Sequence, residues 1–131
     1  MERLKLNFEL NKPTLNNHVY TTIENDQTRE LIKNNLLFLH EGVIEDPDYS
    51  TILDSPIALV KDIIYKDDEI FIDVEFFKKP VYDVFNVTIY GIGIPNFNKD
   101  KKIIEISEFN LKGFFIYNME DKWQIMIYLG S

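Results

Sequence analysis

Short runs of apolar residues at strand-like spacing recur along this chain of 131 residues, and they constrain its fold more than any other feature. In residues 3–10, leucine or phenylalanine alternates with a polar residue, which is the period-two pattern of a strand with one buried face. A series of such runs predicts a mainly β domain. The later runs occupy residues 18–23, 57–65, 69–77, 83–94, 103–109, 111–117 and 123–129.

One segment, residues 26–35, has the pattern of a short helix instead. Thr22 or Asn25 can cap its start. Leu31 and Leu36 would then lie on one face of the helix. A single helix among about eight strands indicates a small, partly open β-barrel or two packed antiparallel sheets, so the fold class is mainly β (α+β).

Two of the runs predict a β-hairpin. Residues 57–65 and 69–77 flank Lys66-Asp67-Asp68, a sequence suited to a tight turn. Alternation in the second run places Ile72 and Val74 toward the core.

Three further segments complete the pattern. Residues 36–44 fit either a strand or a continuation of the helix, and residues 95–102 have the polar composition of a loop. Gly91-Ile92-Gly93 lacks the third glycine and the following helix of a dinucleotide-binding loop. We therefore expect these glycines to let a strand bend or to let another backbone approach closely.

Composition limits the classes of function. The length fits one domain, residues 1–131, and 45% hydrophobic residues supply enough apolar mass for one core. The absence of cysteine excludes disulfides, zinc-thiolate sites and thiol catalysis, and it suits a reducing compartment. A net charge of −8 disfavours direct binding to nucleic acid or to an anionic membrane. No apolar stretch approaches the ~20 residues of a membrane span.

The negative charge is concentrated in one region. Residues 41–75 contain eleven Asp or Glu and two Lys, a local charge of −9. Such a region is either a solvated face or a surface that selects a basic partner. Its spacing matches no calcium-loop signature, so we expect no metal site, and we expect no cofactor. The candidate partner-binding residues are carboxylates in its expected turns, namely Asp46, Asp48, Asp67, Asp68 and Glu69.

Histidine and serine spacing identifies no catalytic set. A nucleophile needs a base within hydrogen-bond reach and a third group that orients the base. His18 follows an Asn-Asn pair and His40 precedes Glu41, so we assign each histidine a structural or surface role.

Three segments, taken in order, carry a resemblance to a known family. Asn16-Asn17-His18-Val19-Tyr20 precedes the expected helix, and Gly42-Val43-Ile44-Glu45-Asp46-Pro47 follows it. Thr88-Ile89-Tyr90-Gly91-Ile92-Gly93 lies beyond the hairpin. This order resembles the capsid-maturation (prohead) proteases of tailed bacteriophages, whose fold is similar to that of the herpesvirus assemblins. In that family the second segment contains a histidine that acts as general base, and the third contains the nucleophilic serine.

The resemblance implies a protease-like barrel whose catalytic positions are replaced. Asp46 occupies the place of the histidine and Ile89 that of the serine, while Thr88 has no evident activating partner. We therefore expect a noncatalytic phage or prophage protein that binds itself or another protein in assembly, in the host cytoplasm or in the virion. The alternative is an acidic inhibitor that occupies the basic nucleic-acid-binding site of a host or defence protein. A serine- or threonine-type hydrolase is the third hypothesis.

Overall fold

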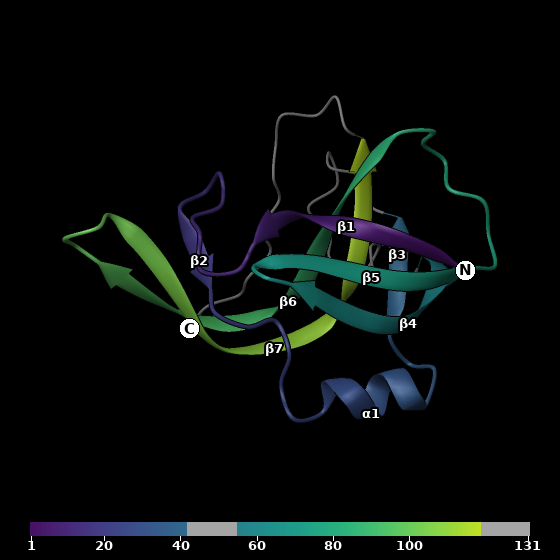
Figure 1. Ribbon diagram of the computed structural model, residues 1–131, viewed down its shortest axis with the longest axis horizontal. Helices are drawn as coiled ribbons and strands as arrows, with labels where there is room; N and C mark the ends of the chain where they lie inside the picture. Colours follow the sequence, from purple (N-terminus) through teal and green to yellow (C-terminus); the bar gives the residue numbers. More distant parts are fainter. Residues whose placement is uncertain (42–54, 119–131) are drawn as a thin grey trace.

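The part of the chain that the structure describes forms one curled β-sheet with a single short helix (Figure 1). The computed structural model describes residues 1–41 and 55–118. Its mainly β architecture confirms the predicted fold class. In chain order the elements are β1 (Glu2–Glu9), β2 (His18–Tyr20), α1 (Thr28–Lys33), β3 (Phe38–Glu41), β4 (Pro56–Lys66), β5 (Glu69–Phe76), β6 (Phe85–Asn98) and β7 (Ile103–Asn118).

The sheet curls into a half-barrel. Its strand order is β1-β5-β4-β3-β7-β2, and β6 pairs with β7 as a branch from this path. β7 is long enough for one of its edges to pair with two short strands, because β3 pairs in parallel with residues 114–116 and β2 with residues 104–106. β6 pairs antiparallel with β7 along its whole length. β1, at the far end of the path, lies close to β6 and narrows the opening of the half-barrel.

The predicted hairpin is confirmed. β4 and β5 pair antiparallel through a two-residue turn, Asp67-Asp68. Asp67 has a φ of 56°, a left-handed conformation that aspartate adopts more readily than most side chains. Ile72 and Val74 are fully buried, as the alternation predicts.

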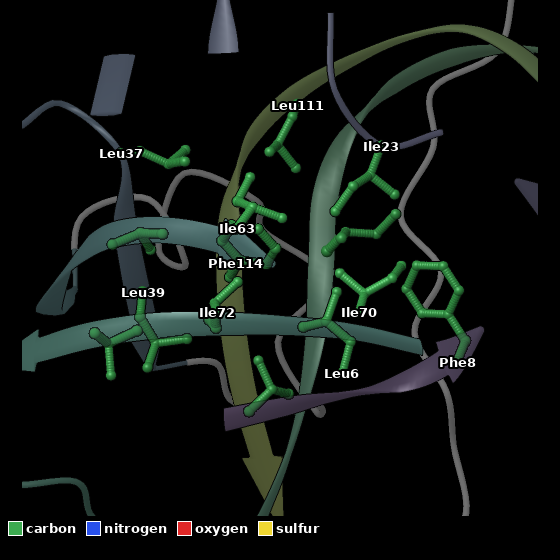
Figure 2. Close-up of a cluster of buried hydrophobic side chains, with 14 of the residues drawn as sticks. Leu6, Phe8, Ile23, Leu37, Leu39, Ile63, Ile70, Ile72, Leu111 and Phe114 are labelled. Carbon is green, nitrogen blue, oxygen red and sulfur yellow. The ribbon is translucent and has the colours of Figure 1, made fainter. Parts of the chain in front are cut away.

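The core lies on the inner side of the curled sheet. Figure 2 shows that side chains from β1, β5, β3 and β7 meet in one cluster. Burying each of these aliphatic or aromatic side chains contributes roughly 1.5–3 kcal/mol relative to leaving it in water. The labelled residues are Leu6, Phe8, Ile23, Leu37, Leu39, Ile63, Ile70, Ile72, Leu111 and Phe114.

β6 and β7 are longer than the sequence predicts. The expected loop over residues 95–102 is wrong, because β6 continues through Pro95 and the chain turns only at residues 99–102. The runs at 103–109 and 111–117 are one continuous strand, β7. Pairing along both strands satisfies the backbone of the polar residues, so tertiary context overrides their weak strand preference. A proline fits here because, within the described residues, β6 pairs on one edge only.

The helix lies where the sequence predicts it, but its ends differ. α1 falls within residues 26–35, and its N-cap is Gln27 rather than Thr22 or Asn25. Asn25 instead accepts a hydrogen bond at Oδ1 from the Gln27 N–H at 3.0 Å, an Asx turn that leads into the helix. Leu36 is exposed, because the helix ends before reaching it.

The open choice for residues 36–44 is settled as a strand, since β3 occupies most of the part that the structure describes. The predicted run at residues 123–129 lies outside the described residues.

Candidate interaction surface

Thr88 and Ile89, the positions that resemble the serine motif of the phage proteases, are adjacent on β6 and face opposite sides of the sheet. Ile89 belongs to the core. Thr88 is fully buried on the other face, where it pairs with Phe115 of β7, which in turn pairs with His40 of β3. Thr88, Phe115 and His40 therefore form one row across three strands.

This row does not place a base beside the threonine. Adjacent strands are about 4.8 Å apart, so Thr88 and His40 are separated by about two strand spacings, with Phe115 between them. Among the described residues, the Thr88 hydroxyl has no hydrogen-bond partner. His40 packs against Gly113, where an added Cβ would lie 3.3 Å from the imidazole ring. Asp46, the other position of the protease-like pattern, lies outside the described residues.

Gly91 and Gly93 have the structural role that the sequence predicts. The β6–β7 ladder shifts register at both glycines. A Cβ on Gly91 would lie 2.5 Å from the carbonyl oxygen of Asn110, and one on Gly93 would lie 2.5 Å from Cγ2 of Ile106. Residues without a side chain are therefore needed at both positions, and such bulges bend the paired strands, as Figure 1 shows for β6 and β7.

Beyond the glycines, the ends of β6 and β7 project from the half-barrel as a two-stranded arm, drawn in green at the left of Figure 1. We call residues 92–107 the β6–β7 arm. Its exposed large side chains are Ile92 (41% exposed), Ile94 (38%) and Phe97 (64%). Sequence reasoning missed this surface, because Pro95 and its polar neighbours have the composition of a loop. The two apolar residues Ile92 and Ile94, spaced two positions apart, were the one sign in the sequence of this surface.

The arm is held in shape by its own hydrogen bonds and by a neighbouring strand. Asn96 donates from Nδ2 to Oγ of Ser107 at 2.9 Å, which links the two strands. At the tip, Oδ1 of Asn98 accepts from the backbone N–H groups of Asp100 at 3.1 Å and Lys101 at 3.2 Å. β2 pairs with the other edge of β7. The arm is thus a supported structure with a defined turn.

The turn at the tip of the arm is basic, although the protein is acidic. Residues 99–102, which we call the basic turn, contain three lysines and one aspartate, all exposed. Their charge of +2 contrasts with −8 for the whole chain. Phe97 precedes this turn by two positions, so the arm ends in apolar and cationic groups together.

The turn of the β4–β5 hairpin lies on the side of the half-barrel from which the arm projects (Figure 1). We call Asp67 and Asp68 the acidic turn; Asp67 is exposed and Asp68 is half-buried. The Leu10 N–H donates to the Asp68 carbonyl at 2.8 Å, and Nδ2 of Asn11 donates to Oδ1 of Asp68 at 3.2 Å. Asn11 and Lys101 both line a hollow of about 440 Å³. A residue that bonds to the acidic turn and a lysine of the basic turn thus share this hollow.

The remaining predicted partner-binding residues are less available. Glu69 forms an ion pair with Lys5 at 3.0 Å. Asp46 and Asp48 lie outside the described residues. Of the predicted set, the structure thus describes the neighbours Asp67, Asp68 and Glu69, and only Asp67 is exposed.

Cations from other segments neutralise much of the rest of the hairpin. Arg29 of α1 reaches Asp62 at 2.6 Å and Glu24 at 2.9 Å. Arg3 of β1 donates to Asp73 at 2.8 Å, and this hydrogen bond lowers the pKa of the Asp73 carboxyl. The acidity that is concentrated in the sequence is therefore partly balanced in the fold.

Two buried titratable side chains lie away from these turns. Burial lowers the pKa of His18, which pairs with Ile104 of the arm. Burial raises the pKa of Tyr117, whose hydroxyl accepts a hydrogen bond from Nδ2 of Asn7 at 2.6 Å. In both cases burial favours the neutral form.

Within residues 1–41 and 55–118, no helix is long and apolar enough to cross a membrane. In the same residues, no three His, Asp or Glu side chains gather as potential metal ligands. No protein-family model, curated protein or solved structure matches this chain.

Proposed function

We propose that this chain is a noncatalytic phage or prophage protein that binds a protein through its β6–β7 arm, in assembly. One observation carries the proposal: the arm projects from the half-barrel and ends in exposed apolar side chains beside a basic turn. Exposed aromatic residues often act as anchors in protein interfaces, where they bury a large area for few lost rotamers. The phage context rests on the resemblance of three segments to the prohead proteases.

Burial of the protease-like positions supports the noncatalytic part of the proposal. A substrate must reach the nucleophile, and both Thr88 and Ile89 are buried in the sheet. Incubation with phage capsid and scaffolding proteins should therefore yield no cleavage products. Cleavage that disappears in Thr88→Ala would contradict this part and make Thr88 the nucleophile.

The acidic-inhibitor hypothesis has less support. Its surface would be the β4–β5 hairpin, where Arg3, Arg29 and Lys5 already pair with carboxylates. In the acidic turn of this hairpin, Asp67 is exposed and Asp68 is half-buried, so no broad exposed group of carboxylates remains in its described part. Capture of a nucleic-acid-binding protein that is lost in Asp67→Asn with Asp68→Asn would favour the inhibitor instead.

A matched pair of phenylalanine variants tests the arm. Phe97 and Phe77 are both exposed, at 64% and 58%, but only Phe97 lies on the arm. Immobilised wild-type protein, Phe97→Ser and Phe77→Ser would each be mixed with phage lysate and with purified copies of the chain. We expect Phe97→Ser alone to lose its bound protein. Equal retention by all three would place the contact elsewhere and refute the proposal.

The gene neighbourhood offers an independent check of the phage context. Adjacent portal and capsid genes would support a role in assembly, whereas adjacent defence genes would support the inhibitor.

A further inference from the structure

We infer that the second edge of β6, along residues 85–91, is a strand-acceptor site that pairs with residues 123–129 of the same chain. We call residues 85–91 the β6 edge segment; they come directly before the β6–β7 arm. The inference goes beyond the proposed function, because it concerns another part of β6 and does not depend on what the arm binds.

The backbone of the β6 edge segment needs a second partner. Within the described residues, β6 pairs with β7 alone, so half of the backbone N–H and C=O groups in this segment point away from the ladder. The segment is nevertheless buried, because Val87 and Ile89 belong to the core and Thr88 is fully buried on the opposite face. Buried backbone groups nearly always have hydrogen-bond partners. A further strand beside this edge would supply them.

The arm, which continues the same strand, has no such need. Ile92 and Ile94 are exposed there, so water can bond to the outer edge. A hollow of about 650 Å³ adjoins the start of β6 and is lined by Phe85, Asn86 and residues 5–9 of β1. The described chain therefore leaves space beside the buried part of β6.

The end of β7 lies within reach of this space. Asn118 pairs with Phe85, so β7 ends where the β6 edge segment begins. A strand on the far side of β6 would lie two strand spacings, or roughly 10 Å, from β7. The four residues 119–122 can span roughly 13 Å. A chain that continues from Asn118 can therefore cross the end of β6 and then run parallel to it.

Residues 123–129 have the length and the pattern that this edge requires. They number seven, as do residues 85–91. Every second residue is large and apolar, which is typical of a strand with one face toward a core. Residues 42–54, by contrast, lack this alternation and contain Pro47 and four carboxylates. The alternating apolar residues are Trp123, Ile125, Ile127 and Leu129.

Amide hydrogen exchange of the full chain, followed by NMR, tests the pairing. In a strand with one partner every second N–H exchanges fast, whereas a strand with partners on both edges protects consecutive N–H groups. We expect consecutive protection at residues 86–90. Residues 96–98, on the exposed arm, are the internal control and should show alternate protection.

A matched pair of variants at Ile125 identifies the occupant. Ile125→Pro removes an N–H from the middle of the run, whereas Ile125→Val keeps the N–H and most of the apolar volume. In Ile125→Pro, the N–H groups of residues 86–90 that point away from β7 should exchange at least about tenfold faster. Those that point toward β7 should keep their rates, and Ile125→Val should match wild type.

A cross-link tests the same contact without a proline in the strand. The chain has no cysteine, so Asn86→Cys with Gln124→Cys introduces its only two thiols. A short bifunctional thiol reagent should join them within one chain. Asn86→Cys with Lys101→Cys, in the basic turn, is the control and should remain unlinked.

Three outcomes overturn the inference. Alternate protection throughout β6 would mean that the β6 edge segment has no second partner. Consecutive protection that persists in a folded Ile125→Pro protein would assign the edge to another segment. A cross-link that does not form, or that forms only between two copies, would place residues 123–129 of the same chain elsewhere. None of these outcomes decides the proposed function, because the comparison of Phe97→Ser with Phe77→Ser tests the arm separately.

Discussion

The β4–β5 and β6–β7 hairpins are both antiparallel pairs, yet they present charge and apolar surface in opposite ways. The β4–β5 hairpin lies in the most acidic part of the sequence, but Arg3 and Arg29 from other segments pair with its carboxylates. The arm of the β6–β7 hairpin contains only two carboxylates, and its three lysines are exposed at a projecting tip. Local sequence charge is therefore a poor guide to the charge that a partner meets.

The positions of the two hairpins in the sheet explain the difference. β5 lies between β1 and β4, so its inward side chains form part of the core. β6 pairs with β7 alone within the described residues, and beyond Gly91 and Gly93 the pair leaves the half-barrel. Apolar residues with the same alternation thus become core in one hairpin and surface in the other.

The same substitution in each hairpin should have very different effects on stability. Ile72→Ala removes a fully buried side chain and should lower the free energy of unfolding by about 2–5 kcal/mol. Ile94→Ala alters a side chain that is 38% exposed on the arm and should cost less than about 1 kcal/mol. Urea denaturation measures both. Equal costs would mean that the arm packs as tightly as the core.

The bend that directs the arm away from the half-barrel should depend on Gly91 and Gly93. Gly91→Ala places a Cβ 2.5 Å from the Asn110 carbonyl oxygen, so the strands must shift, at a cost of about 1–3 kcal/mol. Gly113→Ala is the control, because a Cβ added there would lie 3.2 Å from its nearest neighbour, the Phe38 carbonyl oxygen. Thermal unfolding of both variants gives the comparison. A Gly91→Ala protein as stable as wild type would show that the bulge adapts without strain.

The sequence predicts those parts of the fold whose signals are local. Alternation identifies β1, the β4–β5 pair and the inward direction of Ile72 and Val74, because one buried face leaves a period of two. It fails for Pro95, since a single proline and polar neighbours indicate a loop unless a long partner strand is known. The union of 103–109 and 111–117 into β7 likewise depends on pairing with β6.

The candidate surface was predicted in part. The turn at Asp67 and Asp68 was found, because two acidic residues between apolar runs favour an exposed turn. The arm was not found, since its exposure depends on where the sheet ends rather than on its own residues.

Removing the Arg29 cation, which pairs with two carboxylates, should show how much these ion pairs contribute to stability. Arg29→Met keeps the apolar stem but loses the ion pairs to Asp62 and Glu24, at a cost of about 1 kcal/mol or less, because these groups are partly exposed. The cost should shrink at high salt. Lys112→Met, at an exposed position of β7, serves as control. A loss for Arg29→Met that salt leaves unchanged would assign its effect to packing of the side chain.

Acid should lower stability through His18, in the strand beside the arm, and through Asp73, in the β4–β5 hairpin, in different pH ranges. Burial lowers the pKa of His18 in the folded protein, so its stabilising contribution is complete above the unfolded value near 6.5 and is lost as pH falls through the folded value. The pKa of Asp73 is lowered by Arg3, so its contribution persists until pH falls below the ordinary aspartate value near 3.9. His18→Gln should therefore flatten the decline in unfolding free energy just below pH 6.5, while Asp73→Asn should flatten only the decline in stronger acid. Urea denaturation across this pH range measures both slopes. If His18→Gln leaves the first decline unchanged, another group causes it, and the side of the molecule that carries the arm is less sensitive to acid than the burial of His18 implies.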